Sequence, residues 1–187
     1  MSELFATGEP RSGAEIVAAM TRLHTESERY LETVPAIEFA APQGEKWSPA
    51  DHVRHLAKST YPLVGALGLP KIVLGLRFGR CRSGSRSLPE MREIYRATLR
   101  ETGATAGRFA PSPQSSPTDP AAWQREVLAK WRGAVSGLAA KIPGWSEAAL
   151  DRYQLPHPLL GKLTVREMLL FTVYHNAHHL EQVAGRR

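Results

Sequence analysis

Cysteine is nearly missing from this chain, with Cys81 the single one among 187 residues. One cysteine cannot form an intrachain disulfide or a cysteine-based zinc knuckle, so packing must hold the fold together, with a metal ion as the other available aid. The composition therefore predicts a reducing, cytoplasmic setting.

Long apolar runs are missing as well. No segment reaches the roughly 18 uninterrupted apolar residues of a membrane-spanning helix. Residues 1–10 lack the positively charged leader and apolar run of a secretory signal. We therefore expect a chain that is soluble, is not exported and has no membrane partner.

Several sequence signatures are also lacking. There is no G-x-S-x-G motif, P-loop or dinucleotide fingerprint, so no nucleotide cofactor is expected. There is no H-E-x-x-H, which argues against a zincin-type peptidase. No run of useful length alternates between apolar and polar residues, and so nothing predicts a β-strand.

Basic residues outnumber acidic ones, 24 to 18, which gives a formal net charge of +6. Four of the arginines gather in one segment: Arg77, Arg80, Arg82 and Arg86. Such a loop could meet a nucleic acid or an anionic substrate, but interleaved aromatics and a nucleic-acid-binding motif are lacking. A solvated loop is the favoured interpretation, and no nucleic-acid partner is expected.

Four segments carry apolar residues at helical spacing: 13–34, a stretch from 48 to a break between 62 and 70, 121–142 and 165–184. The second begins with Ser48 as its N-cap and Pro49 at the first helical position. The last begins with a capping box of Thr164 and Glu167. These start signals make both helices firm expectations.

The segments between these helices carry weaker patterns. Residues 71–90 suggest a short apolar piece and a Gly/Ser/Arg loop, 89–101 a helix, and 102–120 a linker rich in proline and serine. We interpret 79–120 as a loop or insertion with a linker inside a single domain of residues 1–187. Four long amphipathic helices predict an all-α four-helix bundle, whose ligand sites commonly lie between facing helices.

Three of the seven histidines lie in the last predicted helix and continue its apolar stripe. His175 and His179 are one turn apart, so both imidazoles can reach one divalent metal ion. His178 is an alternative partner for His175. In a simpler interpretation no metal is bound, and the histidines only interact with the dipole at the C-terminal end of their helix. A third ligand must come from another helix, with His55 as the candidate and His52 as its substitute.

Three segments together resemble a known family: W-S-P-A-D-H-V-R-H-L at 47–56, H-P-L-L-G-K-L-T at 157–164 and Y-H-N-A-H-H-L-E-Q at 174–182. Their order and spacing are similar to those of the DinB-like superfamily. The resemblance implies an up-down-down-up four-helix bundle. It also implies a divalent metal held by one histidine of the second helix and an H-x-x-x-H pair on the last, here His55, His175 and His179. Residues 79–120 match nothing specific.

The resemblance also implies a function, because the superfamily includes metal-dependent hydrolases and S-transferases or isomerases that use a low-molecular-weight thiol. Three histidines leave a coordination position for water or a thiol. We expect a metal-dependent hydrolase or thiol S-transferase acting on a small molecule, with zinc or nickel, or else iron or manganese. Asp51 and Glu181 are the acids whose place in the sequence would let them serve as a base.

Two further points stay open at this stage. In one alternative the metal only stiffens the bundle, or the protein binds a partner without catalysis; a fourth protein ligand would favour this, because structural zinc sites are closed. The second point concerns the apolar residues Ile72, Val73, Leu74 and Leu76, which either form a homodimer surface or cover a pocket.

Overall fold

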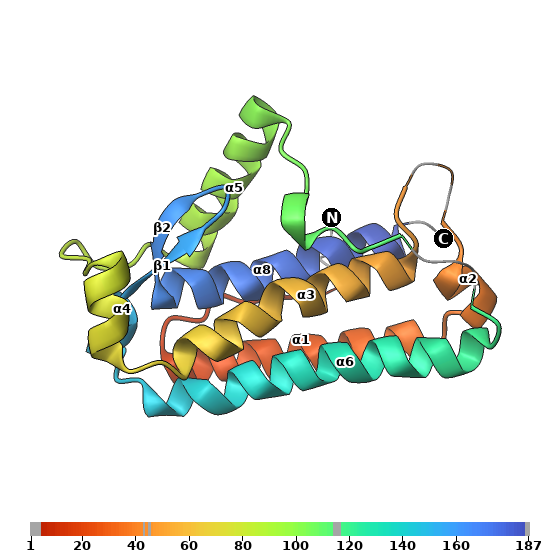
Figure 1. Ribbon diagram of the computed structural model, residues 1–187, viewed down its shortest axis with the longest axis horizontal. Coiled ribbons are helices and arrows are strands. Elements are labelled where there is room, and N and C mark those ends of the chain that lie inside the picture. Colours follow the sequence, from red (N-terminus) through yellow and green to blue (C-terminus); the bar gives the residue numbers. More distant parts are fainter. Residues whose placement is uncertain (1–4, 43, 45, 114–116, 186–187) are drawn as a thin grey trace.

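The computed structural model describes residues 5–42, 44, 46–113 and 117–185. Residues 1–4 of the N-terminal segment and 114–116 of the proline-rich linker, both used above, lie outside the described residues. Four long helices dominate: α1 (Gly13–Glu32), α3 (Pro49–Leu67), α6 (Pro120–Lys141) and α8 (Val165–Ala184). They lie side by side along the longest axis, with α1 and α6 below α3 and α8 (Figure 1).

Shorter elements connect and cover these helices. They are α2 (Ala36–Ala40), α4 (Lys71–Phe78), α5 (Leu88–Thr102), the 3-10 turns η1 (Gly107–Phe109) and η2 (Ile142–Gly144), α7 (Glu147–Arg152), β1 (Gln154–His157) and β2 (Gly161–Thr164). Helix α5 leaves the bundle at an angle, and η1 returns the chain to α3 (Figure 1).

Contacts between the long helices fix their directions. Gln124 near the start of α6 donates to the carbonyl of Leu31 at the end of α1, so these two helices are antiparallel. Tyr61 of α3 donates to the carbonyl of Lys130 in the middle of α6. The ring nitrogen of Trp145, just after α6, donates to the carbonyl of Leu67, the last residue of α3, so α3 and α6 run in parallel.

Helix α8 completes the bundle. Its first turn lies beside the start of α1, where Arg166 donates to the carbonyl of Arg11, so α8 is parallel to α1. It is antiparallel to α3, because His55 meets His175 while the earlier His52 meets the later His179. The order is up, down, down, up, and the prediction of an all-α four-helix bundle of this topology is confirmed.

The predicted start signals hold. Ser48 and Asp51 form a reciprocal capping box at α3, and Thr164 and Glu167 form one at α8. The expected break in α3 falls at the later of the two places: the helix continues through Pro62 and ends at Leu67. Packing of this helix against α6 and α8 compensates for the backbone hydrogen bond that a proline removes.

A β-hairpin precedes α8, and the sequence did not predict it. Leu155 pairs with Leu163 in the antiparallel register of β1 and β2, and both side chains are buried. Each strand has four residues, and Pro156 interrupts any alternation in the first. Four residues are too few for a period-2 pattern to stand out, so packing against the start of α8 decides this structure.

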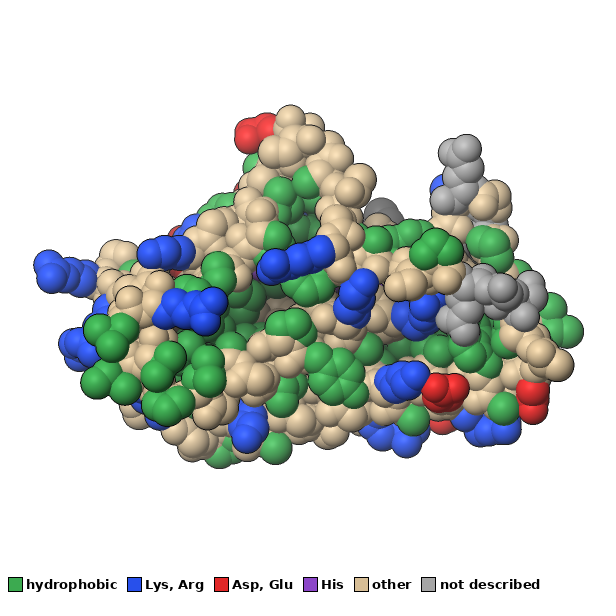
Figure 2. All heavy atoms as spheres, in the orientation of Figure 1, with side chains coloured by type: hydrophobic (Ala, Val, Ile, Leu, Met, Phe, Trp, Pro, Cys, Tyr) green, Lys and Arg blue, Asp and Glu red, His purple; other side chains and the backbone are tan. Residues whose placement is uncertain are grey.

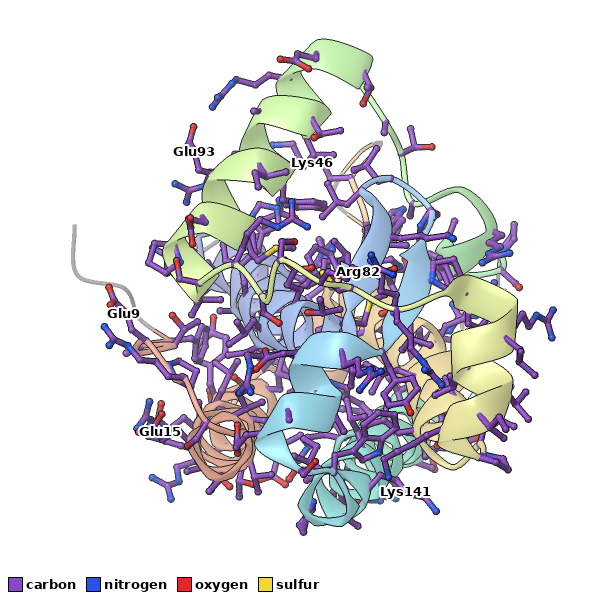
Figure 3. All side chains as sticks on the ribbon, turned by 90° about the vertical axis from the view of Figure 1, so that its left-hand side faces the viewer. Glu9, Glu15, Lys46, Arg82, Glu93 and Lys141 are labelled. Carbon is purple, nitrogen blue, oxygen red and sulfur yellow. The ribbon has the colours of Figure 1, made fainter. Side chains whose placement is uncertain are left out.

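One apolar core runs through the bundle. Trp131 of α6 is fully buried, donates its ring N–H to Asn176 of α8 at 2.9 Å, and lies against His24 of α1 with ring centroids 4.4 Å apart. Truncating a buried tryptophan of this kind costs about 3–5 kcal/mol. Most charged side chains lie outside, whereas Arg166 and Glu167 are buried near the start of α8. Figure 3 shows Glu15 and Lys141 pointing away from the bundle.

The apolar segment that begins at Ile72 forms α4. Leu74 is fully buried, whereas Ile72, Val73 and Leu76 are exposed, and none of the four lines the histidine pocket described below. Across the described residues, no single helix has the length and apolar character to cross a membrane. The pair α3 and α4 meets that criterion jointly but bends by 111°.

Candidate metal centre

Three histidines from two helices converge on one point. The Nε2 atom of His175 on α8 lies 3.1 Å from Nε2 of His55 on α3 and 3.1 Å from Nε2 of His179, one turn further along α8. Their ligand atoms all lie within 4.8 Å of one another. The structure thus brings together the three residues that the sequence analysis named.

These distances suit a shared metal ion. Two nitrogens at about 2.0–2.1 Å from one ion lie roughly 2.8–3.4 Å apart when they subtend an octahedral or tetrahedral angle. The two 3.1 Å separations around His175 fall in that interval. No fourth histidine, cysteine or carboxylate joins the cluster among the described residues, so the donor set has the three-ligand form of an open site.

The protonation of the three rings also favours a shared metal ion. Nδ1 of His55 donates to the carbonyl oxygen of Phe109 at 2.9 Å. Because a carbonyl only accepts, Nδ1 carries the proton and Nε2 of the neutral ring keeps its lone pair. Nε2 of His175 faces two nitrogens but has one in-plane position, for either a proton or a lone pair. One central ion would use all three lone pairs at once, which protons cannot do.

Burial keeps these imidazoles neutral. It is the largest cause that lowers the pKa of His175 and His179 well below the ordinary value, and the neighbouring histidines lower both further. Burial also lowers the pKa of His55, although its hydrogen bond to Phe109 opposes the shift. Neutral imidazole is the form that binds a metal, so the fold prepares all three rings for coordination.

His52 and Trp47 support the cluster from one side. Nδ1 of His179 lies 2.8 Å from Nδ1 of His52, so His52 orients His179 and does not replace His55. The indole of Trp47 stacks on His179 with ring centroids 6.0 Å apart and 15° between planes, and its centroid lies 5.2 Å from that of His55. The sequence analysis assigned no such role to either residue.

His178 lies elsewhere on α8. Its Nε2 is 3.1 Å from the side-chain nitrogen of Gln182, and its ring stands against Tyr95. The alternative pairing of His175 with His178 is therefore not the one that the structure shows. A full turn places His179 over His175, whereas three residues rotate the side chain toward α5.

A pocket of about 720 Å³ leads from the protein surface to these histidines, within the range of small-molecule sites. Apolar side chains of α3, α5, β1 and α8 form most of its walls, among them Leu63, Leu99, Leu155, Met168 and Phe171. Figure 2 shows apolar and basic side chains around the hollow in this face. Among the described residues, no aspartate or glutamate lines the pocket.

A family model described as the DinB superfamily matches residues 22–183 of the 187. This chain belongs to the DinB superfamily. No curated protein and no solved structure matches it in the corresponding comparisons. DinB membership and the three-histidine cluster both indicate metal binding, whereas neither identifies the ion.

Two parts of this DinB chain to which the sequence analysis gave no role in the site complete it. The linker at 102–120 supplies the carbonyl of Phe109 that orients His55, and Lys58 ties the next residue by donating to the carbonyl of Ala110. The β-hairpin supplies His157 to the pocket wall. A backbone carbonyl leaves no mark on residue type, so no sequence pattern could have indicated the first of these contacts.

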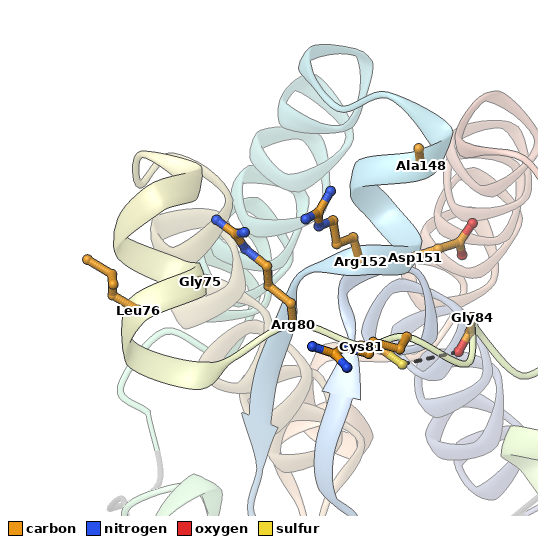
Figure 4. Close-up of a pocket in the computed structure, with 9 residues that line it drawn as sticks. Gly75, Leu76, Arg80, Cys81, Gly84, Ala148, Asp151 and Arg152 are labelled. Atoms are coloured by element: carbon orange, nitrogen blue, oxygen red, sulfur yellow. Dashed lines mark hydrogen bonds between the residues drawn. The ribbon is translucent and has the colours of Figure 1, made fainter.

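The four clustered arginines separate into three places. Arg77 lines the histidine pocket. Arg86 is bound to the buried carboxylate of Glu167 at 2.6 Å and is therefore not solvated loop. Arg80 and Arg82 line a second hollow, between α4 and α7 (Figure 4).

Cys81 lines that second hollow, which is separate from the histidine pocket. Its lining shares no residue with the histidine pocket. The thiol of Cys81 donates to the carbonyl of Gly84 at 3.5 Å, and contact with the Ser83 hydroxyl is the largest cause that lowers its pKa (Figure 4). Among the described residues, no histidine lines the hollow that holds Cys81, so none stands there to act as a base.

Proposed function

We propose that this chain is a metal-dependent S-transferase that joins a low-molecular-weight thiol to a small molecule, with His55, His175 and His179 holding one divalent ion. The observation that carries the proposal is the set of three neutral, converging Nε2 atoms at the inner end of a pocket that no described carboxylate lines. Imidazole ligands suit zinc and nickel, and also iron or manganese.

The pocket favours a thiol over water as the nucleophile. A divalent ion supplies Lewis acidity at its open position, where a thiol loses its proton more completely than a water does. Hydrolysis would gain from a carboxylate base, but Asp51 is bound to the Ser48 backbone and to Arg54, and Glu181 does not line the pocket. Of the two activities expected from the resemblance, transfer fits these residues better.

The reaction can be written so that its atoms balance. The sulfur of the thiol forms a bond to an electrophilic carbon of the second substrate. The leaving group departs with the electron pair of its own bond to that carbon, and the thiol proton passes to the leaving group or to solvent. The apolar walls exclude bulk water from this step.

Metal content tests the first half of the proposal. Untagged protein purified without chelator should contain close to one divalent ion per chain by elemental mass spectrometry, and His55→Ala/His175→Ala/His179→Ala should contain almost none. Circular dichroism must show that the variant is folded. His178→Ala, which removes an imidazole on the same helix but outside the cluster, should keep its ion.

Product formation tests the second half. Metal-loaded protein is incubated with glutathione or cysteine and 1-chloro-2,4-dinitrobenzene, and thioether absorbance is followed against the triple variant. We expect thioether formation that depends on the three histidines. Stoichiometric metal with no transfer by either thiol would instead support a non-catalytic, metal-stabilised bundle.

A further inference from the structure

His157 stands in the pocket wall with its protonation form fixed by the backbone. Its Nδ1 accepts hydrogen bonds from the backbone N–H groups of Leu159 at 3.2 Å and Leu160 at 3.0 Å. Nδ1 therefore carries no proton, and the single proton of the neutral ring sits on Nε2. Burial holds the pKa of His157 at about 4, so the ring is neutral at physiological pH.

His157 lines the pocket. The hairpin turn occupies the Nδ1 side of the imidazole, and Nε2 lies on the side away from those two amides. The ring packs edge-on against Phe171 with centroids 4.5 Å apart, and Phe171 in turn stacks on His175. Within the described residues, Nε2 of His157 has no hydrogen-bond acceptor.

The charged side chains around the pocket favour a ligand of one charge sign. Arg77 at the end of α4 and Arg108 in η1 both line it, each guanidinium lying over the neighbouring ring, Phe78 and Phe109 respectively. Neither forms an ion pair within the described part of the chain. With two cations and no described carboxylate in the lining, an anion is favoured and a cation is disfavoured.

We propose that this pocket binds a small organic acid with an apolar body, one of whose oxygens accepts the hydrogen bond of His157 Nε2–H. The body packs against the aliphatic and aromatic walls, and Arg77 and Arg108 favour the carboxylate. The inference deepens the proposed function, since it names the class of the second substrate and rests on that function for its catalytic meaning. His157 is a binding residue here and touches no metal ligand directly.

Two substitutions separate this role from the simpler one of capping the hairpin turn. In His157→Asn the side-chain oxygen takes the place of Nδ1 and can accept from the same amides, as in an Asx turn, but no donor reaches the pocket. In His157→Gln the side-chain nitrogen takes the place of Nε2, so the pocket donor stays and the turn loses its acceptor.

The probes are octanoate, octan-1-ol and octylammonium, titrated by calorimetry into protein of measured metal content. Octanoate should bind most tightly and octylammonium most weakly. His157→Asn should weaken octanoate about tenfold, in line with a lost hydrogen bond to a charged group, while His157→Gln should weaken it less than threefold. Arg77→Ala/Arg108→Ala should weaken octanoate and leave octan-1-ol unchanged, and Arg82→Ala should change neither.

Equal octanoate affinity in folded His157→Asn and wild type would overturn the inference, and so would equal affinity for octylammonium and octanoate. Acetate that competes as well as octanoate would also overturn it, because the metal ion alone would then bind the carboxylate. The two proposals fail separately. Octanoate binding that depends on His157 without thioether formation would refute only the transferase, and thioether formation with octanoate affinity indifferent to His157 would refute only the organic-acid site.

Discussion

Helix α8 carries two polar clusters, one near each end, and they differ in how their polar atoms are satisfied. At the N-terminal end, Arg166 uses all five of its N–H donors: two on the Asp151 carboxylate, one on the Glu147 carboxylate, and two on the carbonyls of Arg11 and Glu147. That cluster is closed by the protein itself.

In the C-terminal cluster, by contrast, the protein does not satisfy every polar atom. The Nε2 atoms of His55 and His179 both lie within hydrogen-bond distance of Nε2 of His175, whose one in-plane position can serve only one of them. Burying a polar group without a partner is unfavourable, so such an arrangement persists when something else satisfies it. A closed network holds a helix in place, whereas an open donor set at the end of a pocket marks a site for an ion.

The largest expected effect separates the clusters by metal content. His175→Ala removes the nitrogen that contacts both other ligands, so metal should fall from about one ion per chain to nearly none. Arg166→Ala should keep its ion, because no ligand contacts that cluster. Elemental mass spectrometry on both variants measures the difference; equal metal content would remove the distinction.

As the pH falls, the stability that the two clusters contribute should be lost one after the other. The histidine pKa values are lower in the folded chain than the ordinary 6.5, so below about pH 6.5 the unfolded chain takes up protons that the folded chain resists, and stability falls. His175, which is buried, and His179, which is partly buried, each lower the free energy of unfolding by up to about 1.4 kcal/mol per pH unit in this range. This applies to chelator-treated protein.

The carboxylates of the other cluster respond later. The pKa of Asp151 is lowered, chiefly by Arg166, and that of Glu147 is lowered, chiefly by the Gly13 N–H, so the stability they contribute is present above their ordinary values of 3.8 and 4.5 and is lost below them. Urea unfolding between pH 8 and pH 3 should therefore show two successive losses. One loss, near pH 4, would contradict the assignment of neutral buried histidines.

A smaller effect is expected on the closed cluster. Arg166→Ala removes two hydrogen bonds from Asp151, which keeps the one from Ser85, and takes this donor from the carbonyls of Arg11 and Glu147. We expect the free energy of unfolding to fall by about 2–3 kcal/mol. Arg132→Ala is the matched control, because Arg132 pairs with Glu28 while more than half exposed, and such pairs contribute less than about 1 kcal/mol. Urea denaturation of both variants measures the contrast, and equal losses would show that Arg166 is no more than a surface pair.

The smallest effect concerns the support of the open cluster. His52→Ala removes the group that orients His179, and metal affinity should fall about tenfold. His52→Asn places an oxygen near the position of Nδ1 and should recover most of that affinity. Competition with a chromogenic chelator measures it; an unchanged affinity in His52→Ala would leave His179 oriented by Trp47 alone.

Much of this molecule follows from short-range signals. The capping boxes at Ser48 and Thr164 and the apolar spacing of the four long helices predict the bundle, because these features act within one or two turns. One turn of helix also suffices to place His175 and His179 together. The sequence offered His55 or His52 as the third ligand, and the family resemblance implied His55, since no local pattern connects α3 to α8.

Contacts between distant segments decided the rest. The hairpin is too short to show a period, and its two strands are stable because Leu155 and Leu163 pack into the core beside α8. The register between the antiparallel helices α3 and α8 places His55 at the metal position and His52 away from it. The carbonyl that fixes the proton of His55 comes from a linker 54 residues later. Sequence alone determined which groups were available, and tertiary structure determined which nitrogens meet, because an interaction between distant segments depends on packing that neither segment encodes by itself.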